Sequence, residues 1–303
     1  MTPGPDSLEH DREALLARHR AAVRDRLLRS DHVRAGPDSI TWKINREVIV
    51  VAGWGRAILL QLAHPAVAAG VHDHSTIRRG GLVAGVRRLR STVGAMQSLA
   101  FGDTEQMIAA AARINAIHDR VKGRAYSAHD PGLQRWVHAT LIESIPRTYE
   151  LLVGPLTLHE RDQYCSEAAI MEPLLGMPAG WLPRNSADLD TYMREMLADG
   201  GLGVTDTSRA LARKVLFPSK WQVVWPAFRA MQLVTIGSLP PSIRQAYGFA
   251  WRARDERALA RWTTCIRASL RLLPPIAREW PMARHVLQTS PERSRLEGQG
   301  LPV

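Results

Sequence analysis

The chain has 303 residues, of which 45% are hydrophobic, so it is long enough to bury one large core or two closely joined ones. Lysine and arginine number 40 against 29 aspartates and glutamates, a formal net charge of +11 at pH 7. A positive charge suits nucleic acid, an anionic membrane surface or an acidic ligand. Most of the basic residues are arginines spread along helical segments, without an RNP, zinc-finger or helix-turn-helix pattern. We therefore expect a solvated basic face and no nucleic-acid partner.

The two cysteines, Cys165 and Cys265, form no C-x-x-C pair and have no spacing suited to zinc or an iron–sulfur cluster. This usage fits a reducing cytosol, and the charged N-terminal segment lacks the apolar stretch of a signal peptide. The most apolar segment, residues 48–63, contains Arg56 and is too short and interrupted to span a bilayer. We expect a cytoplasmic protein without a transmembrane segment. Net charge is the one feature of the sequence that favours peripheral contact with a membrane.

Helical periodicity dominates the first sixty residues. Residues 9–29 have charged and apolar positions at spacings of three and four, which is typical of an amphipathic surface helix. Ser39 is placed to cap a helix that runs to about Leu62, with apolar positions nearly all the way round, as in a buried central helix. His64-Pro65 then imposes a break, because proline lacks a backbone donor and restricts the residue before it.

The next segment, residues 66–81, is irregular and glycine-rich at its end, so we predict a loop with at most one helical turn. Helices are predicted at about 82–99 and 104–121, where Asp103 or Thr104 caps the second and Gly123 ends it. These two helices are expected to form a hairpin.

In the second half, Asp130-Pro131 opens a helix that continues to about residue 152, and Thr157 with Glu160 forms a capping box. Further helices are predicted at about 158–173, 186–198, 205–216, 219–237, 240–246 and 255–272. We find no convincing β-sheet and no repeat period of a solenoid.

The predicted fold is therefore all-α, a single large multi-helix domain. Residues 1–38 are expected to form an N-terminal amphipathic helix and linker, and residues 39–275 the main domain. Residues 276–303 are expected to be a partly disordered tail, since few apolar residues follow Pro281.

Arg88 and Thr92 are four residues apart, so on a helix they share one face. Apolar neighbours suggest that part of this helix is buried, and a buried guanidinium needs an anionic partner. A haem propionate, a bound oxygen species or a polar substrate would serve. On spacing alone, a salt bridge to an acid on a neighbouring helix is the commoner explanation.

Two histidines lie on apolar helix faces further along the chain. His118 has Ile114, Ile117 and Val121 around it, and His138 follows Trp136 by two residues. A neutral imidazole on such a face can bind iron if its second nitrogen is held by a carbonyl or carboxylate. Asp119 points away from His118, so this partner should come from another helix. By periodicity alone, a hydrogen-bonded core histidine is more common.

A second cluster, His64, His72 and His74, offers a different metal site, because two histidines and a carboxylate such as Asp73 suffice for a non-haem metal. Against this, the histidines lie on a predicted turn without a preorganised spacing or a firm carboxylate partner. Exposed or capping histidines are the simpler interpretation. The patterns of common hydrolases, P-loop NTPases and dinucleotide-binding enzymes do not occur.

An ordered series of short motifs extends over roughly residues 40–270. It comprises His64-Pro65, His74-Ser75, Arg88 to Thr92, Phe101-Gly102-Asp103, His118 with Val121 and Gly123, Tyr126 to Pro131, Trp136 to Leu141, Leu158, Glu160, Tyr164, Glu167, Gly176 to Pro178, Leu182-Pro183 and Tyr192. Together they resemble the oxygenase family that contains latex clearing protein, a rubber oxygenase, and the mycophenolic acid pathway oxygenase MpaB.

The resemblance implies an all-helical, globin-like packing around haem b, in an enzyme that uses dioxygen. It places His118 at the proximal iron ligand and matches Arg88 and Thr92 to polar residues of the haem pocket, where they would orient or protonate an oxygen intermediate. Arg113 and His138 match more loosely near the same site.

One position departs from the family. In rubber oxygenase a lysine just before the motif threonine can ligate the distal side of the iron, and this chain has Ser91 there. Because a hydroxyl is a poor iron ligand, we expect an open or water-filled sixth coordination site.

The resemblance therefore predicts a haem-dependent oxygenase that acts on a hydrophobic, unsaturated, isoprenoid- or lipid-like substrate. Two alternatives stay open at this point. One is a haem-binding protein without turnover, and the other is a non-haem metal enzyme that uses His64, His72 and His74.

Overall fold

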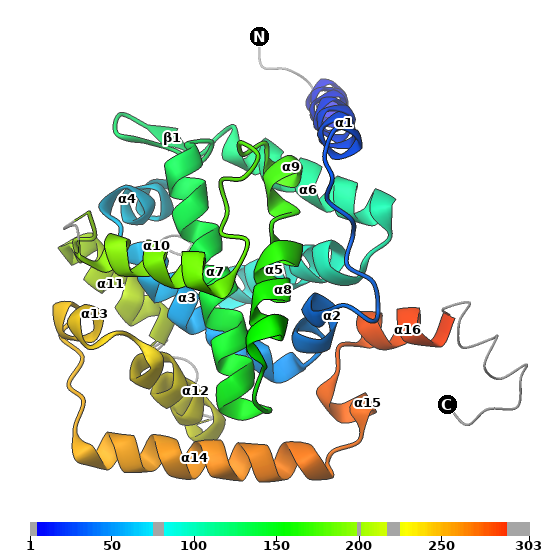
Figure 1. Cartoon of the computed structure of the whole chain (residues 1–303). Helices are drawn as coiled ribbons and strands as arrows, with labels where there is room; N and C mark the ends of the chain where they lie inside the picture. Colours follow the sequence, from blue (N-terminus) through cyan, green and yellow to red (C-terminus); the bar gives the residue numbers. More distant parts are fainter. Residues whose placement is uncertain (1–4, 75–81, 199–200, 217–224, 290–303) are drawn as a thin grey trace, which may run out of the picture.

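The computed structural model describes the backbone of residues 5–74, 82–198, 201–216 and 225–289. Side chains are described over the same ranges except at 5–8, 82–89, 225–227 and 288–289. Within these ranges the chain is almost entirely α-helical, and the helices pack around one central pair (Figure 1). The predicted all-α fold is confirmed.

The first five helical segments show where the sequence was misleading. They are α1 (Pro5–Leu28), α2 (Ile40–Asn45), the 3₁₀ helix η1 (Val48–Val51), α3 (Ala52–Leu62) and α4 (Pro65–His74). Ser39 does cap a helix, since its side chain accepts a hydrogen bond from the backbone N–H of Trp42. The single helix predicted from Ser39 to Leu62 is wrong, because the chain breaks around buried Glu47, which forms a β-bridge with Glu279.

The predicted break at His64-Pro65 is confirmed, but the loop predicted after it is wrong as far as residue 74. Helix α4 begins at Pro65, where proline suits the first turn, and Ala68 and Gly70 are buried. Its last residue is His74, and residues 75–81 lie outside the described part of the chain.

The predicted helical hairpin is present as α5 (Leu82–Phe101) and α6 (Thr104–His118), with a capping box between Asp103 and Gln106. The α6 helix ends at His118, earlier than predicted. Gly123 lies in a two-residue antiparallel hairpin, β1 (Lys122–Gly123) and β2 (Tyr126–Ser127), where the Tyr126 ring would collide with any Cβ at residue 123. Glycine is therefore required by this contact and not by a helix C-cap.

The chain then continues through ten further described helices, whereas seven were predicted from residue 130 onwards. The helix predicted at 158–173 is divided into two, and two helices after residue 272 were not predicted. The ten helices are α7 (Pro131–Leu152), α8 (Leu158–Ala168), α9 (Met171–Leu175), α10 (Ser186–Ala198), α11 (Asp206–Leu216), α12 (Trp225–Ser238), α13 (Pro241–Ala246), α14 (Ala253–Leu272), α15 (Pro275–Arg278) and α16 (Pro281–Thr289). The caps predicted at Asp130 and at Thr157 with Glu160 are both confirmed.

Part of the expected C-terminal tail is ordered. Helix α16 buries Ala283 completely against Trp42 of α2 and Phe101 of α5, whose rings meet edge to face at 4.9 Å. The prediction of a frayed segment is therefore wrong for residues 281–289. Residues 290–303 lie outside the described part of the chain.

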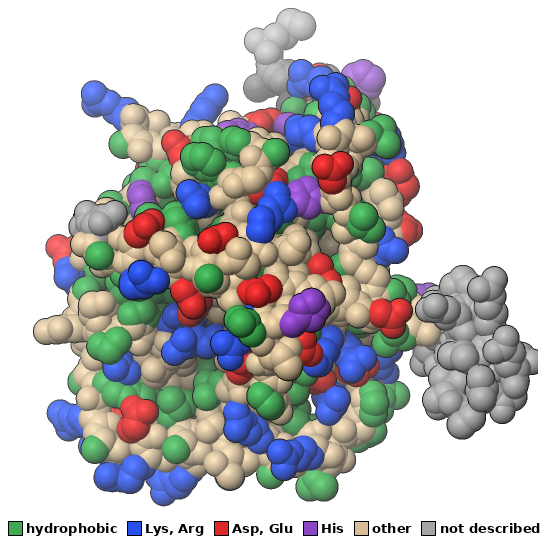
Figure 2. Space-filling model, viewed as in Figure 1, with side chains coloured by type: hydrophobic (Ala, Val, Ile, Leu, Met, Phe, Trp, Pro, Cys, Tyr) green, Lys and Arg blue, Asp and Glu red, His purple; other side chains and the backbone are tan. Residues whose placement is uncertain are grey.

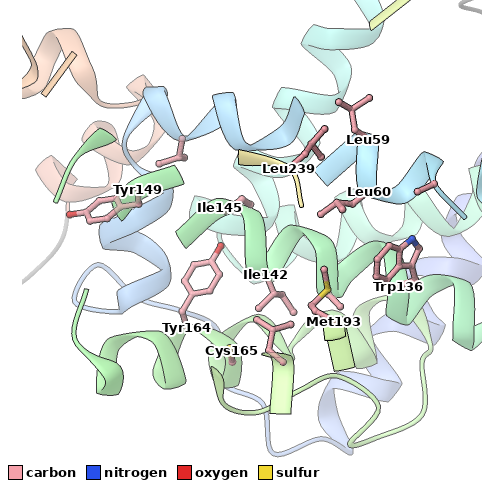
Figure 3. Packing of buried hydrophobic residues seen from close by; sticks show 14 of the residues in the cluster. Leu59, Leu60, Trp136, Ile142, Ile145, Tyr149, Tyr164, Cys165, Met193 and Leu239 are labelled. Atoms are coloured by element: carbon pink, nitrogen blue, oxygen red, sulfur yellow. The ribbon is translucent and has the colours of Figure 1, made fainter. Parts of the chain in front are cut away.

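Helices α3 and α7 cross at the centre of the fold. Leu59 and Leu60 of α3 and Trp136, Ile142 and Ile145 of α7 belong to the largest hydrophobic cluster of the described residues (Figure 3). The helices approach closely at Gly53, where a Cβ would lie 2.6 Å from the Thr148 hydroxyl and 2.8 Å from the Ser144 carbonyl oxygen. Because α7 begins beside His129 and carries His138, this packing fixes the position of both residues.

Helix α1 is attached to the main domain. Val23, fully buried, packs with Met107, Ile108 and Ala111 of α6 and with Leu174 of α9. The N-terminal helix thus covers the outer side of the helix that ends at His118.

Among the described residues, no single helix is long and apolar enough to cross a membrane. One pair, Val48–Leu62 and Pro65–His74, reaches the required length and composition only when taken together, and it is bent by 107°.

Candidate active site

Three histidines meet where α6 ends and α7 begins. His118 is the last residue of α6, His129 lies just before the Asp130 cap of α7, and His138 lies in the third turn of α7. We call His118, His129 and His138 the histidine centre. The caps at Asp103 and Asp130 fix where the two helices begin, so local sequence signals contribute directly to the placement of these rings.

The rings of His118 and His129 are in contact, with centroids 5.8 Å apart and planes at 80°. His129 is held from its other side, since its Nε2 lies 2.8 Å from Oδ1 of Asp119. The second oxygen of Asp119 lies 2.8 Å from Nε2 of His19 in α1. Asp119 therefore links the N-terminal helix to the ring that packs against His118.

Burial decides the charge of His118 and His138, the two inner members of the histidine centre. It lowers the pKa of His118 to about 4, with a further lowering from the charge of His129 and an opposing effect of Asp119. Burial also lowers the pKa of His138 to about 4, and the charge of His118 adds to this effect. Both imidazoles are consequently neutral at pH 7, which is the form that binds a metal ion.

Asp119 is the anionic member of the cluster. Partial burial acts to raise the pKa of its carboxyl group, but the hydrogen bonds with His19 and His129 outweigh this and lower the pKa below its ordinary value. The carboxylate is therefore charged at neutral pH. It faces the two outer histidines and leaves His118 without a direct acidic partner.

The donor atoms of His118 bear on whether an iron group fits. Its Nδ1 is buried and has no hydrogen-bond partner among the described residues. Leaving a polar atom in that state costs about 1–3 kcal/mol, so buried nitrogens are normally paired. A neutral imidazole with an unpaired nitrogen has the chemistry that a proximal haem ligand needs.

Of the other three predicted pocket residues, one has no described side chain and two are exposed. The side chain of Arg88 lies outside the described residues, although its backbone belongs to α5. Thr92 and its neighbour Ser91 are exposed, so this end of α5 is not the buried face that the sequence suggested. Arg113 is exposed and lies five residues from His118, about 140° around α6. Of the four predicted residues whose side chains the structure describes, only His118 and His138 are brought together.

The alternative histidine cluster is not assembled. His64 precedes α4 and its Nδ1 accepts a hydrogen bond from the backbone N–H of Ala66, whereas His72 and His74 lie in the last turn of the same helix. His72 pairs with Asp73, which also accepts a hydrogen bond from Tyr126. No group of three His, Cys, Asp or Glu side chains in the described ranges is placed to hold a metal ion.

Sequence reasoning missed three residues of this region: His19, Asp119 as a bridge, and His129. His19 and Asp119 are one hundred residues apart in the chain, so no local pattern joins them. The sequence does give a weak indication for His129. It directly precedes the Asp130 cap and Pro131 of α7, so it must lie close to the start of that helix.

Comparison with known families identifies the family to which the chain belongs. The family model described as "ER-bound oxygenase mpaB/B'/Rubber oxygenase, catalytic domain" matches residues 41–268, three quarters of the chain. The chain belongs to this oxygenase family. The match spans α3, α6 and α7, and therefore includes the whole histidine centre.

Two mycobacterial proteins are similar to the chain over the same extent. They are the uncharacterized proteins Mb2261 of Mycobacterium bovis and Rv2237 of Mycobacterium tuberculosis. Each is 27% identical over 228 residues, which cover 72% of this chain and 87% of the relative. No solved structure matches the chain.

Proposed function

We propose that this protein is a haem b-dependent oxygenase in which His118 is the proximal iron ligand. The observation that carries the proposal is the neutral, half-buried His118 with an unpartnered Nδ1, in a chain that belongs to an oxygenase family. When bound, the haem would supply the iron at which dioxygen is activated.

His118 would present a neutral nitrogen and be kept in orientation by the edge of the His129 ring. His138, also neutral, would accept or donate a hydrogen bond on the same side without introducing a charge. Arg88 and Thr92 are four residues apart on α5, the helix that pairs with α6, and we include them because the family resemblance matches them to polar residues of the haem pocket. With haem present, their side chains would serve as hydrogen-bond and proton donors to the oxygen substrate.

Oxygenases act on a small-molecule substrate with dioxygen, and for this chain we propose a hydrophobic substrate with a C=C bond. The support is family membership together with the apolar surroundings of α3 and α7. Ser91 takes the position of a family lysine that can fill the distal side, and serine is a poor iron ligand. With Ser91 at this position we propose that the chain supplies no second side-chain ligand, so that haem, when bound, would be accessible to water or dioxygen.

The absorption spectrum of the purified protein tests this function. We expect a Soret band that shifts on reduction with dithionite and shifts again when carbon monoxide is added, because carbon monoxide needs an open coordination site. A reduced spectrum that carbon monoxide does not change would indicate two side-chain ligands and a haem-binding protein without turnover. A colourless protein that still binds iron would overturn the haem assignment.

A further inference from the structure

Helix α14 lies at the edge of the molecule with one long side open to solvent. Of its twenty residues none is buried, although it packs along α12 and α7 (Figure 1). Residues spaced three and four apart on its open side are all exposed and form what we call the α14 stripe. The α14 stripe consists of Arg254, Arg257, Arg261, Cys265, Ala268 and Leu272.

The first half of the α14 stripe carries charges that the protein does not neutralise. Arg254, Arg257 and Arg261 make no ion pair within the described part of the chain, and Arg271 beside the stripe makes none either. The two acids of α14 are engaged elsewhere. Asp255 lies 3.3 Å from Arg229 of α12, and Glu256 accepts a hydrogen bond from the Trp251 ring.

The other end of α14 is apolar. Leu272 is 86% exposed, Ile276 is 68% exposed and Leu273 is 42% exposed. We call these three residues the apolar tip. Single exposed leucines are ordinary on protein surfaces, but three within five residues beside an arginine stripe indicate an interaction site. Figure 2 shows blue arginine side chains along the lower edge of the molecule, where α14 lies, with hydrophobic side chains among them.

The helix is anchored so that this side stays outward. Arg267, which is not in the stripe, turns back and donates hydrogen bonds to the backbone carbonyls of Glu150 and Leu151 at the end of α7. Gly237 of α12 admits Leu259 and Trp251 at close range, so the inner side of α14 is packed tightly. Neither the α14 stripe nor the apolar tip takes part in these contacts.

We propose that the α14 stripe and the apolar tip bind the surface of an anionic lipid bilayer. The arginines would contact lipid phosphates while Leu272, Leu273 and Ile276 enter the interfacial region, as in other amphipathic helices that lie in the plane of a membrane. Charge favours this partner over a second copy of the chain. A symmetric dimer through this face would bring like-charged arginines together on a chain that already carries +11.

Cys265 gives a direct probe, because it is exposed in the middle of the α14 stripe whereas Cys165 is buried. Burial also raises the pKa of the Cys165 thiol to about 12, which keeps it unreactive towards maleimides. An environment-sensitive fluorophore can thus be attached to Cys265 of the full-length natural protein. We expect its emission to shift to the blue and intensify with vesicles of phosphatidylcholine and phosphatidylglycerol, and to stay unchanged with phosphatidylcholine alone.

Vesicle sedimentation of unlabelled protein checks that the dye does not cause the binding. The triple variant R254Q/R257Q/R261Q should bind anionic vesicles about 100-fold more weakly, since each basic residue near an anionic surface contributes about fivefold. The control R12Q/R20Q/R124Q removes three exposed arginines from α1 and the β-hairpin, and should retain most of the affinity. L272S/I276S should weaken binding at least tenfold, whereas L158S, at a leucine 67% exposed elsewhere, should not.

The proposal fails if both triple variants lose binding equally, because net charge alone would then explain it. It also fails if the labelled protein gives no response to anionic vesicles, or if light scattering shows a dimer that L272S dissociates. None of these measurements depends on haem binding at His118, so lipid binding by α14 is tested independently of the proposed function.

Discussion

The centre of the fold and the histidine centre differ in how they bury an ionisable side chain. In the crossing of α3 and α7, Arg56 is only 4% exposed, and both ends of its guanidinium are paired with Glu143 at 2.7 and 2.9 Å. A third contact goes to the carbonyl of Ser238. At His118 the protein instead keeps the ring neutral and leaves its buried Nδ1 without a partner. Other buried side-chain atoms of the described residues also lack a partner, among them the indole nitrogen of Trp136 in α7, so the contrast concerns charge. The fold pairs a buried guanidinium with a carboxylate, whereas it keeps a buried imidazole neutral.

Breaking the buried ion pair should have the largest effect. We expect Arg56→Met to lower the free energy of unfolding by about 3–5 kcal/mol, because Glu143 would remain as an uncompensated buried charge. Urea unfolding measures this change. R56M/E143L should recover most of the loss, and Arg147→Met should cost under about 1 kcal/mol, since Arg147 is 59% exposed and lies 3.7 Å from the same carboxylate. A small effect of R56M alone would contradict the comparison.

The histidine centre should make the haem-free protein sensitive to acid. In the unfolded chain these rings titrate near pH 6.5, whereas burial lowers the pKa values of His118 and His138 to about 4 in the folded state. Their contribution to stability is therefore complete above pH 6.5 and is lost as the pH falls towards 4, on the order of 2–3 kcal/mol per histidine. Urea unfolding of the natural protein and of H118Q/H138Q, at pH 7 and at pH 4.5, measures the loss of stability that is due to these two histidines. Parallel losses in both proteins would show that the rings are not buried as neutral groups.

The close crossing of α3 and α7 can be tested without changing any charge. Gly53→Ala places a methyl group against a backbone carbonyl and should cost about 1–3 kcal/mol through overpacking. Gly94→Ala in α5 is the matched control, because no atom lies within 4 Å of its added Cβ, and it should stabilise the protein by up to about 1 kcal/mol. Thermal unfolding in which both variants behave alike would argue against the close approach.

The smallest effect is expected at Asp119. Its carboxyl group is 37% exposed, so Asp119→Asn should cost only about 0.5–1 kcal/mol by weakening the contacts with His19 and His129. Chemical unfolding at pH 7 measures the loss, and Asp206→Asn, at a fully exposed carboxylate, is the comparison. A loss above about 2 kcal/mol would mean that this charge is far more buried than its contacts indicate.

The sequence predicted those helix boundaries that depend on neighbouring residues. The caps at Ser39, Asp103, Asp130 and Thr157 involve side chains three residues from the backbone groups that they satisfy, so the pattern contains the whole interaction. The same holds for the break at Pro65.

The wrong boundaries depend on distant parts of the chain. The break around Glu47 is set by its bridge to Glu279 and by Arg278, whose guanidinium lies 3.2 Å from the Glu47 carboxylate. The helix after Pro281 is stabilised by Trp42 and Phe101. No window of sequence contains both partners, so periodicity alone could not reveal either contact.

The candidate site also contains residues that the sequence could identify and residues that it could not. The apolar pattern around His118 and His138 left their role open, and the family resemblance assigned them to one site. The structure brings these two histidines together. Arg113 was included by resemblance, but its side of α6 faces solvent. The bridge from His19 through Asp119 to His129 depends on the docking of α1 and on the irregular hairpin between α6 and α7, which no helical periodicity describes.

The haem content of the purified protein tests the central claim most directly. The pyridine haemochrome assay should find haem in the natural protein and in His64→Ala, whose ring only accepts a hydrogen bond from the Ala66 backbone N–H. It should find almost none in His118→Ala, provided that circular dichroism shows the variant to be folded. Full haem content in folded His118→Ala would contradict the account.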